Sequence, residues 1–289
     1  MLKGWLIYSK KDIGINRAYI DWFITEAALQ SIELELIHRE NLTIGVLNNK
    51  HTVLLNKTHP VLPDFAVVRT IDPMLSLHLE TCGVVVCNNA RIATICNHKA
   101  LTHHYVHSLG IPMVDTVYCK KLDLPANPPF PYPFVMKEVG GRGGQQVYFI
   151  KNDQEYAAYK KSLPTTDFVL QSSQVWHGQD VRVFVIGKHI IAAVLRKSHT
   201  DFRANYKLGG SASLYHLTKK EYRMVQKIVD HFPFDMVGID FLVGLNGELL
   251  FNEIEDVVGS RTLSAVSDIN LLRLYVKHIN EQLMNRQGL

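Results

Sequence analysis

An Asn-Gly pair at 246–247 separates two apolar runs, MVGIDFLVG and ELLFNEI, and limits how this part of the chain can fold. Asn-Gly is the strongest short-range signal for a two-residue type I′ turn, which joins neighbouring antiparallel strands. The sequence therefore predicts a β-hairpin over 236–254 in which Leu245 pairs with Glu248.

The predicted turn fixes which residues lie opposite each other. Counting outward from it places Asp240 opposite Glu253 and Gly238 opposite Glu255. Directly opposed residues share a sheet face, and so do residues two apart along a strand. Asp240, Glu253 and Glu255 are therefore expected together on one face. The pairs expected on the other, mostly apolar face are Ile239 with Ile254, Val243 with Leu250, and Phe241 with Asn252.

Three carboxylates on one face need compensation, because two such groups about 5 Å apart repel by roughly 3 kcal/mol at an effective dielectric near 20. One solution is a divalent cation. Hard oxygen ligands beside the open space expected at Gly238 suit Mg²⁺, with Mn²⁺ as the alternative. The other solution is a solvated sheet face, and both remain open at this point.

A glycine-rich loop between two expected strands, in FVMKEVGGRGGQQVYFI, is the best candidate for binding phosphate. The first strand ends at Lys137, which adds a compact positive charge. The loop glycines are Gly140, Gly141, Gly143 and Gly144. Glycines let backbone N–H groups approach phosphate oxygens without obstruction from Cβ atoms. The loop matches neither a Walker A motif nor GxGxxG, so it is either a flap over a triphosphate or a mobile hairpin without a ligand.

Composition restricts the class of protein. The chain of 289 residues is long enough for about two domains, and its 47% hydrophobic and 20% charged residues exclude intrinsic disorder. A net charge of +4 is too small to predict nucleic-acid binding. No run approaches the roughly 18 apolar residues of a membrane helix, so no membrane partner is expected. The four cysteines form no CxxC pair, and a cytoplasmic location is expected.

Hydrophobic patterns divide the chain into parts. Strands at 4–9, 33–38, 65–70 and 83–88 alternate with helices at 16–32 and after Pro73, which predicts a parallel α/β sheet. A helix at 97–110, capped by Asn97, and a strand at 111–119 follow. From 134 onward, short strands at 134–138, 145–150, 167–171, 180–187 and 189–196 predict antiparallel α+β structure. The expected domains are 1–95, 96–178 and 179–289.

These segments, in this order, resemble the ATP-grasp superfamily and most closely its RimK-like carboxylate–amine ligases. The resemblance covers nearly the whole chain. NNARIATICNHKALTHHYVHSLGIP resembles the family's entry helix, and it places Lys99 at the ATP-binding lysine. FVMKEVGGRGG places Lys137 at the second such lysine, and Gly143 and Gly144 in the mobile loop. The resemblance implies an ATP-grasp fold with an N-terminal parallel α/β domain, a central antiparallel lid and a C-terminal α+β unit.

A further stretch, VLQSSQVWHGQDVRVFVIG, resembles the hinge that holds adenine in this family. The match implies that Gln171, Ser172 and Ser173 flank the base, largely through backbone groups. It also implies that Asp180 lies near the ribose.

The most specific match is AAVLRKSHTDFRANYKLGG, which resembles the family pattern R…DFRxN…GG. The match implies that Arg196, Arg203 and Asn205 surround the phosphates, with the two arginines acting in catalysis. The positions that the resemblance assigns to metal ligands are Asp240, Glu253 and Glu255, the trio that the hairpin also brings together.

The last strand departs from the family pattern. Glu255 stands where the family has asparagine, and the following loop reads DVVGSRTL in place of a Pro-Gly-type loop. Because that loop borders the acceptor substrate in the family, Arg261 there is expected to bind a substrate carboxylate. In the N-terminal part, Arg17, Arg69 and Arg91 are further candidates for a carboxylate contact, although each is also an ordinary arginine at the surface or core edge.

The resemblance implies an ATP- and Mg²⁺-dependent, ADP-forming ligase that joins a carboxylate to an amine through an acyl phosphate. Either substrate could be an amino acid or a peptide, and a homo-oligomer is a further partnership that the resemblance allows. Two alternatives remain: an ATP-grasp phosphotransferase, and a nucleotide-binding protein without catalysis. The sequence identifies neither substrate.

Overall fold

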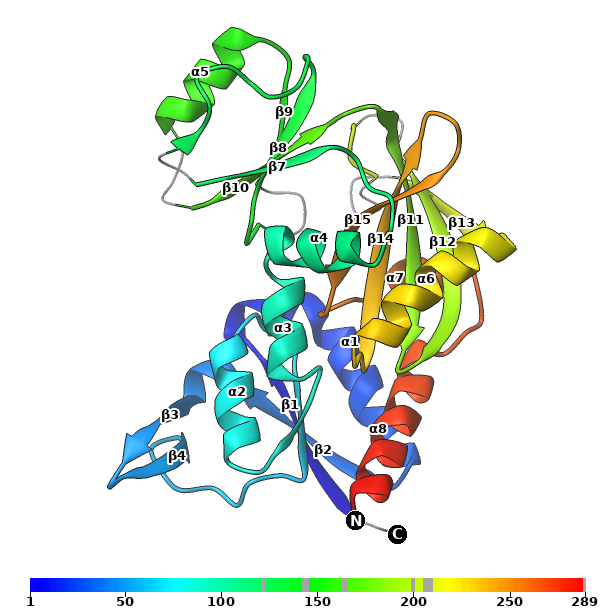
Figure 1. Cartoon of the computed structure of the whole chain (residues 1–289). Helices are drawn as coiled ribbons and strands as arrows, with labels where there is room; N and C mark the ends of the chain where they lie inside the picture. Colours follow the sequence, from blue (N-terminus) through cyan, green and yellow to red (C-terminus); the bar gives the residue numbers. More distant parts are fainter. Residues whose placement is uncertain (121–122, 142–145, 163–165, 199–200, 205–209, 288–289) are drawn as a thin grey trace.

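The structure, a computed structural model, describes residues 1–120, 123–141, 146–162, 166–198, 201–204 and 210–287. Within these residues three larger sheets and one separate hairpin account for the strands. Each sheet belongs to a different part of the chain, and the three parts follow one another from blue through green to red in Figure 1. The described residues contain no helix that is long and apolar enough to cross a membrane.

The N-terminal sheet has the strand order β2-β1-β5-β6, and all of its pairings are parallel. Its strands are β1 (Leu2–Tyr8), β2 (Ile32–His38), β5 (Phe65–Val68) and β6 (Val85–Cys87). The helices of this part are α1 (Lys10–Leu29), α2 (Pro73–Thr81) and α3 (Ala90–Cys96). The predicted parallel sheet is therefore confirmed. Helix α1 begins earlier than expected because the Ser9 side chain accepts a hydrogen bond from the Asp12 backbone N–H at 3.2 Å.

Two features of this part differ from the prediction. The helix expected at 97–110 is shorter, because Asn97 ends α3 and His98 caps the next helix, α4 (Lys99–Ser108). A hairpin of β3 (Leu42–Leu47) and β4 (Lys50–Leu55) was not predicted. Its turn residues Asn48 and Asn49 have φ values of 49° and 59°, as a type I′ turn requires.

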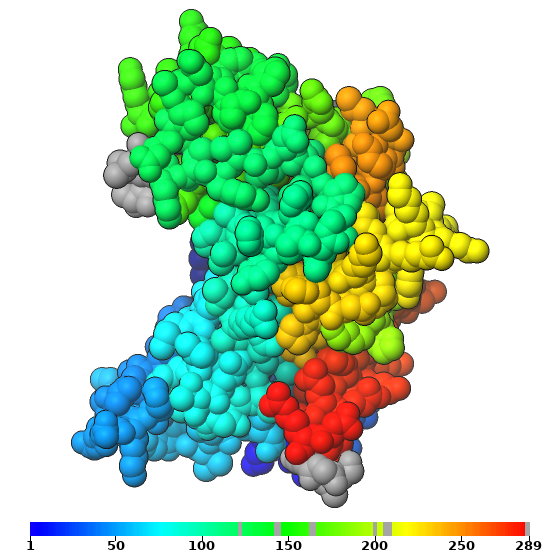
Figure 2. Space-filling view, in the orientation of Figure 1, coloured from blue at the N-terminus to red at the C-terminus, as the bar shows by residue number. Residues whose placement is uncertain are grey.

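The central sheet is antiparallel, as predicted, and has the order β7-β10-β8-β9. Its strands are β7 (Thr116–Cys119), β8 (Phe134–Glu138), β9 (Val147–Ile150) and β10 (Phe168–Ser172), and its helix is α5 (Asp153–Ser162). This unit has a small core of its own around Phe134, Met136 and Phe168. It stands apart from the rest in Figure 1, and the outline in Figure 2 is indented between it and the N-terminal part.

The C-terminal sheet has five antiparallel strands in the order β13-β12-β11-β14-β15. They are β11 (Val175–Ile186), β12 (His189–Lys197), β13 (Ser211–Tyr215), β14 (Met236–Gly244) and β15 (Leu249–Glu255). The helices are α6 (Lys219–His231), α7 (Arg261–Ser264) and α8 (Leu271–Gln287). One face, with Ile239 and Phe241 of β14, packs against Val225 and Ile228 of α6.

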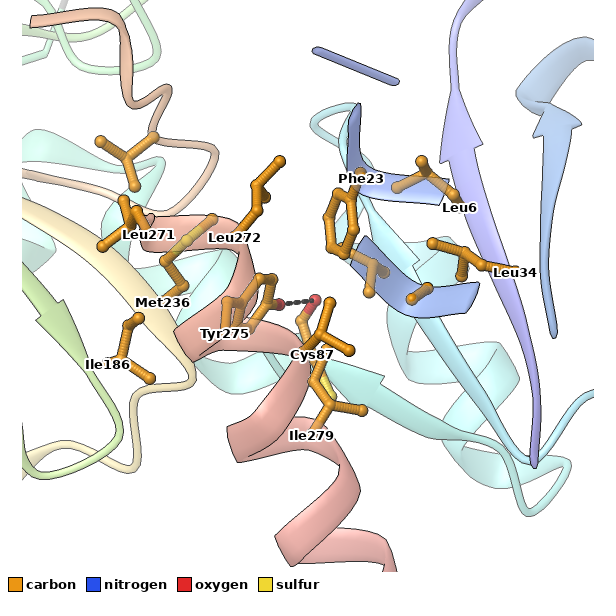
Figure 3. Packing of buried hydrophobic residues seen from close by; sticks show 14 of the residues in the cluster. Leu6, Phe23, Leu34, Cys87, Ile186, Met236, Leu271, Leu272, Tyr275 and Ile279 are labelled. Atoms are coloured by element: carbon orange, nitrogen blue, oxygen red, sulfur yellow. Dashed lines mark hydrogen bonds between the residues drawn. The ribbon is translucent and has the colours of Figure 1, made fainter. Parts of the chain in front are cut away.

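The other face of this sheet is apolar at one end and charged at the other. At the apolar end, Met236 joins a core formed by Leu6 and Phe23 of the N-terminal part with Leu272 and Tyr275 of α8 (Figure 3). The Tyr275 hydroxyl donates to the carbonyl oxygen of Cys87 at 3.2 Å. The first and last parts of the chain thus share one core, and the division at 95/96 and 178/179 stays a prediction. The charged end of the same face carries the candidate site.

Candidate active site

The register of hairpin β14–β15 confirms the predicted pairs at its open end. Gly238 pairs with Glu255, Ile239 with Ile254, and Asp240 with Glu253. The turn itself differs from the prediction. The Gly244 N–H donates to the Glu248 carbonyl at 2.8 Å, and only Gly247 has a positive φ, at 84°. Three residues, 245–247, therefore form the loop instead of two.

The longer turn shifts the strand pairing by one residue near the turn, and a β-bulge farther along the hairpin shifts it back. Near the turn Phe241 pairs with Phe251 and Val243 with Leu249, so the pairs predicted there are wrong. The register then shifts between Asp240 and Phe241, because Asn252 is one extra residue on β15. The extra turn residue and the extra strand residue cancel, which leaves the acidic residues in the predicted pairing.

The bulge also places Asn252 at the site instead of opposite Phe241. Its side-chain oxygen accepts a hydrogen bond from Lys137 Nζ at 2.7 Å. Its carbonyl oxygen lies 2.7 Å from Nε2 of His103, so that nitrogen carries the proton. Burial lowers the pKa of His103 to about 4, and the imidazole is therefore neutral near pH 7. No pattern in the sequence pointed to Asn252.

Asp240 lies at the centre of a buried network of charges. Its two oxygens accept from Nε and Nη2 of Arg182, each at 2.7 Å, and Nη2 of Arg196 donates to Oδ2 at 2.8 Å. Burial alone would raise the pKa of Asp240, but Arg182 and Arg196 outweigh it and lower the pKa to about 2. Asp240 is therefore ionised at any ordinary pH, and its charge is balanced by arginine.

Asp180 and Glu255 extend this network in opposite directions. Asp180 makes two hydrogen bonds of 2.6 Å with Arg196, yet burial outweighs that guanidinium and raises its pKa to about 6. Glu255 Oε2 lies 2.6 Å from Nη2 of Arg182. Sequence reasoning missed Arg182, although a charged residue inside the apolar run VRVFVI was the available signal.

The three acids carry the oxygen ligands that magnesium prefers, and the strand pairing brings them to one sheet face. Their side chains, however, are not arranged around a metal ion in this structure. Among the residues that the structure describes, no three His, Cys, Asp or Glu side chains are arranged to hold a metal ion. The side chains of Glu253 and Glu255 are 39% and 36% exposed, but Oε2 of Glu255 is buried against Arg182. Asp240 could join them only if Arg182 moved aside. The space beside Gly238 is filled, since a Cβ there would lie 2.7 Å from Cγ2 of Val258.

Two lysines from different parts of the chain meet beside Glu253. Lys99, the first residue of α4, donates to the carbonyl oxygen of Gly141, and its Nζ lies 3.7 Å from Oε2 of Glu253. Burial lowers the pKa of Lys137 to about 8, and the charge on Lys99 adds to this while Glu253 opposes it. The structure thus brings Lys99, Lys137 and Glu253 together, as the resemblance implied.

The residues expected beside adenine lie where β10 leads into β11. Gln171 is buried, its Nε2 donates to Thr116 Oγ1 at 3.1 Å, and its Oε1 has no hydrogen-bond partner among the described residues. The Ser172 N–H donates to the Asp115 carbonyl at 3.0 Å, and Ser173 Oγ donates to that of Pro133 at 2.5 Å. The amide oxygen of Gln171 is therefore a buried acceptor that has no donor among the described residues.

The remaining predicted residues are not placed in the cluster. Gly143, Gly144 and Asn205 lie outside the described residues. Arg203 donates to Asp201, with its Nη2 at 2.6 Å from Oδ2. Arg261 is exposed at the start of α7.

Comparison with known proteins identifies the family of the chain. A family model described as the RimK-like ATP-grasp domain matches residues 119–279. The glutamate–LysW ligase ArgX of Sulfurisphaera tokodaii is 26% identical over 231 residues, covering 75% of this chain and 82% of that protein. Human N-acetylaspartylglutamate synthase A is 25% identical over 283 residues, covering 89% of this chain and 70% of its own.

Solved structures show the same fold. A RimK domain ATP-grasp protein from Sphaerobacter thermophilus has a TM-score of 0.74 at 15% identity, covering 96% of this chain and 98% of its own. The ATP-grasp ligase PsnB, solved with a minimal precursor variant, Mg and ADP, has a TM-score of 0.69 at 13% identity, covering 97% and 98%.

Proposed function

The chain belongs to the RimK-like ATP-grasp family and is a ligase that joins a carboxylate to an amine, and from this premise we propose how its residues carry out the reaction. One observation carries the proposal. Lys99 of α4 and Lys137 of β8 lie beside Glu253, next to the Asp240 network on the charged face of the C-terminal sheet. Cations and carboxylates from three segments converge where a triphosphate would need both.

The reaction proceeds in two steps. A carboxylate oxygen of one substrate attacks the γ-phosphorus of ATP, the bond to the β-phosphate oxygen breaks, and ADP leaves. The neutral amine of the second substrate then attacks the carbonyl carbon of the acyl phosphate. A C–N bond forms, the C–O bond to phosphate breaks, and the amine loses a proton. No side-chain nucleophile is required.

The cations stabilise the negative charge that moves during these steps. Lys99 and Lys137 bind phosphate oxygens, and Arg196 and Arg203 stabilise the transferred phosphoryl group. Asn205 contacts the same phosphates. The loop with Gly143 and Gly144 closes over them and excludes water, which protects the acyl phosphate from hydrolysis.

Magnesium, with manganese as the alternative, would be held by Asp240, Glu253 and Glu255. When bound, it neutralises charge on the ATP phosphates and orients them. Both oxygens of Asp240 accept hydrogen bonds from arginine, so Asp240 would join the ligand set only after Arg182 had moved aside. Glu255 in place of the family's asparagine adds one negative charge to this set.

The nucleoside lies at the hinge between β10 and β11. Gln171, Ser172 and Ser173 flank adenine, largely through backbone groups. Asp180 lies near the ribose while it also orients Arg196.

Amino acids are the proposed substrate class, since the relatives include ligases named for glutamate and for N-acetylaspartylglutamate. Arg261, exposed at the start of α7, is proposed to bind a carboxylate of the incoming substrate. ADP release is measured with each amino acid and a panel of peptides, and the products are identified by mass spectrometry. The proposal expects ADP together with a product lighter than the summed substrates by one water. ADP without an amide product would favour a phosphotransferase, and ATP binding without turnover would favour a binding protein.

A further inference from the structure

Arg69 is a buried cation without a carboxylate partner. It follows β5 and is 8% exposed, and all of its hydrogen bonds go to neutral groups. Nε donates to the Tyr8 hydroxyl at 3.2 Å, and Nη2 donates to the Val258 carbonyl at 2.9 Å. Among the described residues, no carboxylate oxygen lies within 4.0 Å of its guanidinium. Arg196, buried to the same extent, has both Asp180 and Asp240 as partners.

A buried guanidinium stays charged, because its pKa is too high for deprotonation at any ordinary pH. Burying such a charge without a counter-ion is costly, so buried charges are normally paired. Tyr19 lies beside Arg69, with the guanidinium carbon 5.3 Å from its ring centroid. The Tyr19 hydroxyl is buried close to Ser260, and among the described residues it lies within hydrogen-bonding range of no anionic group. Two donors next to each other therefore lack an anionic acceptor.

The position of Arg69 connects it to the candidate site. Tyr8 ends β1 and Arg69 follows β5, so both lie at the carboxyl edge of the parallel sheet, where open α/β sheets bind ligands. Val258, whose carbonyl accepts from Arg69, also lies against Gly238 of β14. Val258, in the loop after β15, therefore lies between Arg69 and Gly238 on the acidic face of the sheet.

We propose that Arg69, with the Tyr19 hydroxyl, binds the carboxylate of the amino acid that supplies the amine, an inference that rests on the proposed ligase function. That carboxylate does not react, so it needs a cation away from the phosphates. Nε and Nη2 already donate to Tyr8 and Val258, so among the described contacts Nη1 is the guanidinium nitrogen left for the carboxylate, and its charge favours a carboxylate over a neutral amide. The site then selects amino acids with a free carboxylate over their amides. The other candidates fit less well, since Arg17 is exposed and paired with Asp21, and Arg91 is exposed.

Equilibrium binding tests the inference separately from turnover. Isothermal titration measures binding of L-glutamate and of its α-amide to the full chain saturated with Mg²⁺ and a non-hydrolysable ATP analogue. We expect the wild type to bind L-glutamate at least about tenfold more tightly than the amide. Arg69→Gln should lose that preference, and Arg69→Lys should retain part of it. Arg223→Gln, which removes an exposed arginine on α6, serves as the matched control.

Binding of the ATP analogue to Arg69→Gln should stay within about twofold of wild type, which shows that the variant is folded. The inference is overturned if Arg69→Gln keeps the preference for L-glutamate, or if the wild type binds acid and amide equally or neither. The proposed ligase function is tested by a separate result: it fails only if no pair of amine and carboxylate substrates yields ADP and an amide. A ligase that accepts amines without any carboxylate would keep the function and remove the role of Arg69.

Discussion

At the residue scale, arginine balances two of the three acids, Asp240 and Glu255, and Lys99 lies beside the third, Glu253. Asp240 faces two guanidinium groups and has its pKa lowered to about 2, whereas Asp180, with one, has a pKa near 6 because burial outweighs its single partner. The sequence predicted the carboxylates but not Arg182, since the hairpin count covers only two of the sheet's strands. Arg182 reaches Asp240 from β11, and that pairing lies outside any local pattern.

Glu253→Gln is predicted to lower ADP formation by at least about a hundredfold, because it removes a charge beside both lysines and a proposed metal ligand. The fold should be retained, since the side chain is 39% exposed. ADP release and thermal unfolding are measured side by side. Glu281→Gln, an exposed change on α8, is the control. Wild-type turnover in Glu253→Gln at saturating magnesium would contradict the role assigned to this residue.

Lys137 predicts a dependence of ATP affinity on pH. Its pKa is lowered from 10.5 to about 8, so in the free protein the amine becomes neutral above that pH. ATP phosphates favour the charged form, and ATP affinity should therefore fall by up to about tenfold per pH unit above pH 8. Titration of ATP binding between about pH 7 and pH 9.5 measures this. Lys137→Arg stays charged and should remove the alkaline decrease. A decrease that persists unchanged in Lys137→Arg would assign it to another group.

At the element scale, the β14–β15 hairpin shows what a local pattern can and cannot predict. Asn-Gly correctly indicated a hairpin, and the acids pair as expected. The turn has three residues, however, and the agreement depends on the bulge at Asn252. The bulged residue Asn252 contacts Lys137 and His103, which lie far away in the sequence. A short-range sequence pattern therefore does not predict the bulge.

Asn252→Leu is predicted to weaken ATP binding and to destabilise the fold by about 1–3 kcal/mol. The change leaves the buried Lys137 ammonium without its acceptor, and an unsatisfied buried donor costs roughly that much. Urea denaturation and titration with ATP measure the two effects. Asn252→Asp keeps an acceptor and should bind ATP better than Asn252→Leu does. Equal ATP binding by Asn252→Leu and wild type would mean that Asn252 does not position Lys137.

At the scale of the whole molecule, the order of sheets was predictable and the shared core was not. Parallel and antiparallel parts follow from alternating and clustered strand patterns, and both are confirmed. The packing of α8 against Leu6 and Phe23 joins opposite ends of the chain, and its apolar pattern does not specify a partner. The charged end of the C-terminal sheet is thereby fixed beside the N-terminal sheet, where Arg69 lies.

Leu272→Ala is predicted to destabilise the first and last parts of the chain together, by about 2–5 kcal/mol. Leu272 is fully buried in the core that both parts share (Figure 3). Urea unfolding is followed, in a Trp176→Phe background, by far-UV circular dichroism and by the fluorescence of the two remaining tryptophans, Trp5 and Trp22, in the N-terminal part. Both signals should shift to lower urea by the same amount. A shift in circular dichroism without one in tryptophan fluorescence would show that the two parts unfold independently.

The fate of the carboxylate oxygen tests the central claim most directly. A carboxylate substrate labelled with ¹⁸O is incubated with the enzyme, ATP and the amine, and the released phosphate is analysed by mass spectrometry. An acyl phosphate transfers one substrate oxygen to phosphate, so the account predicts one ¹⁸O in phosphate for each amide formed. Amide formation with unlabelled phosphate would contradict it.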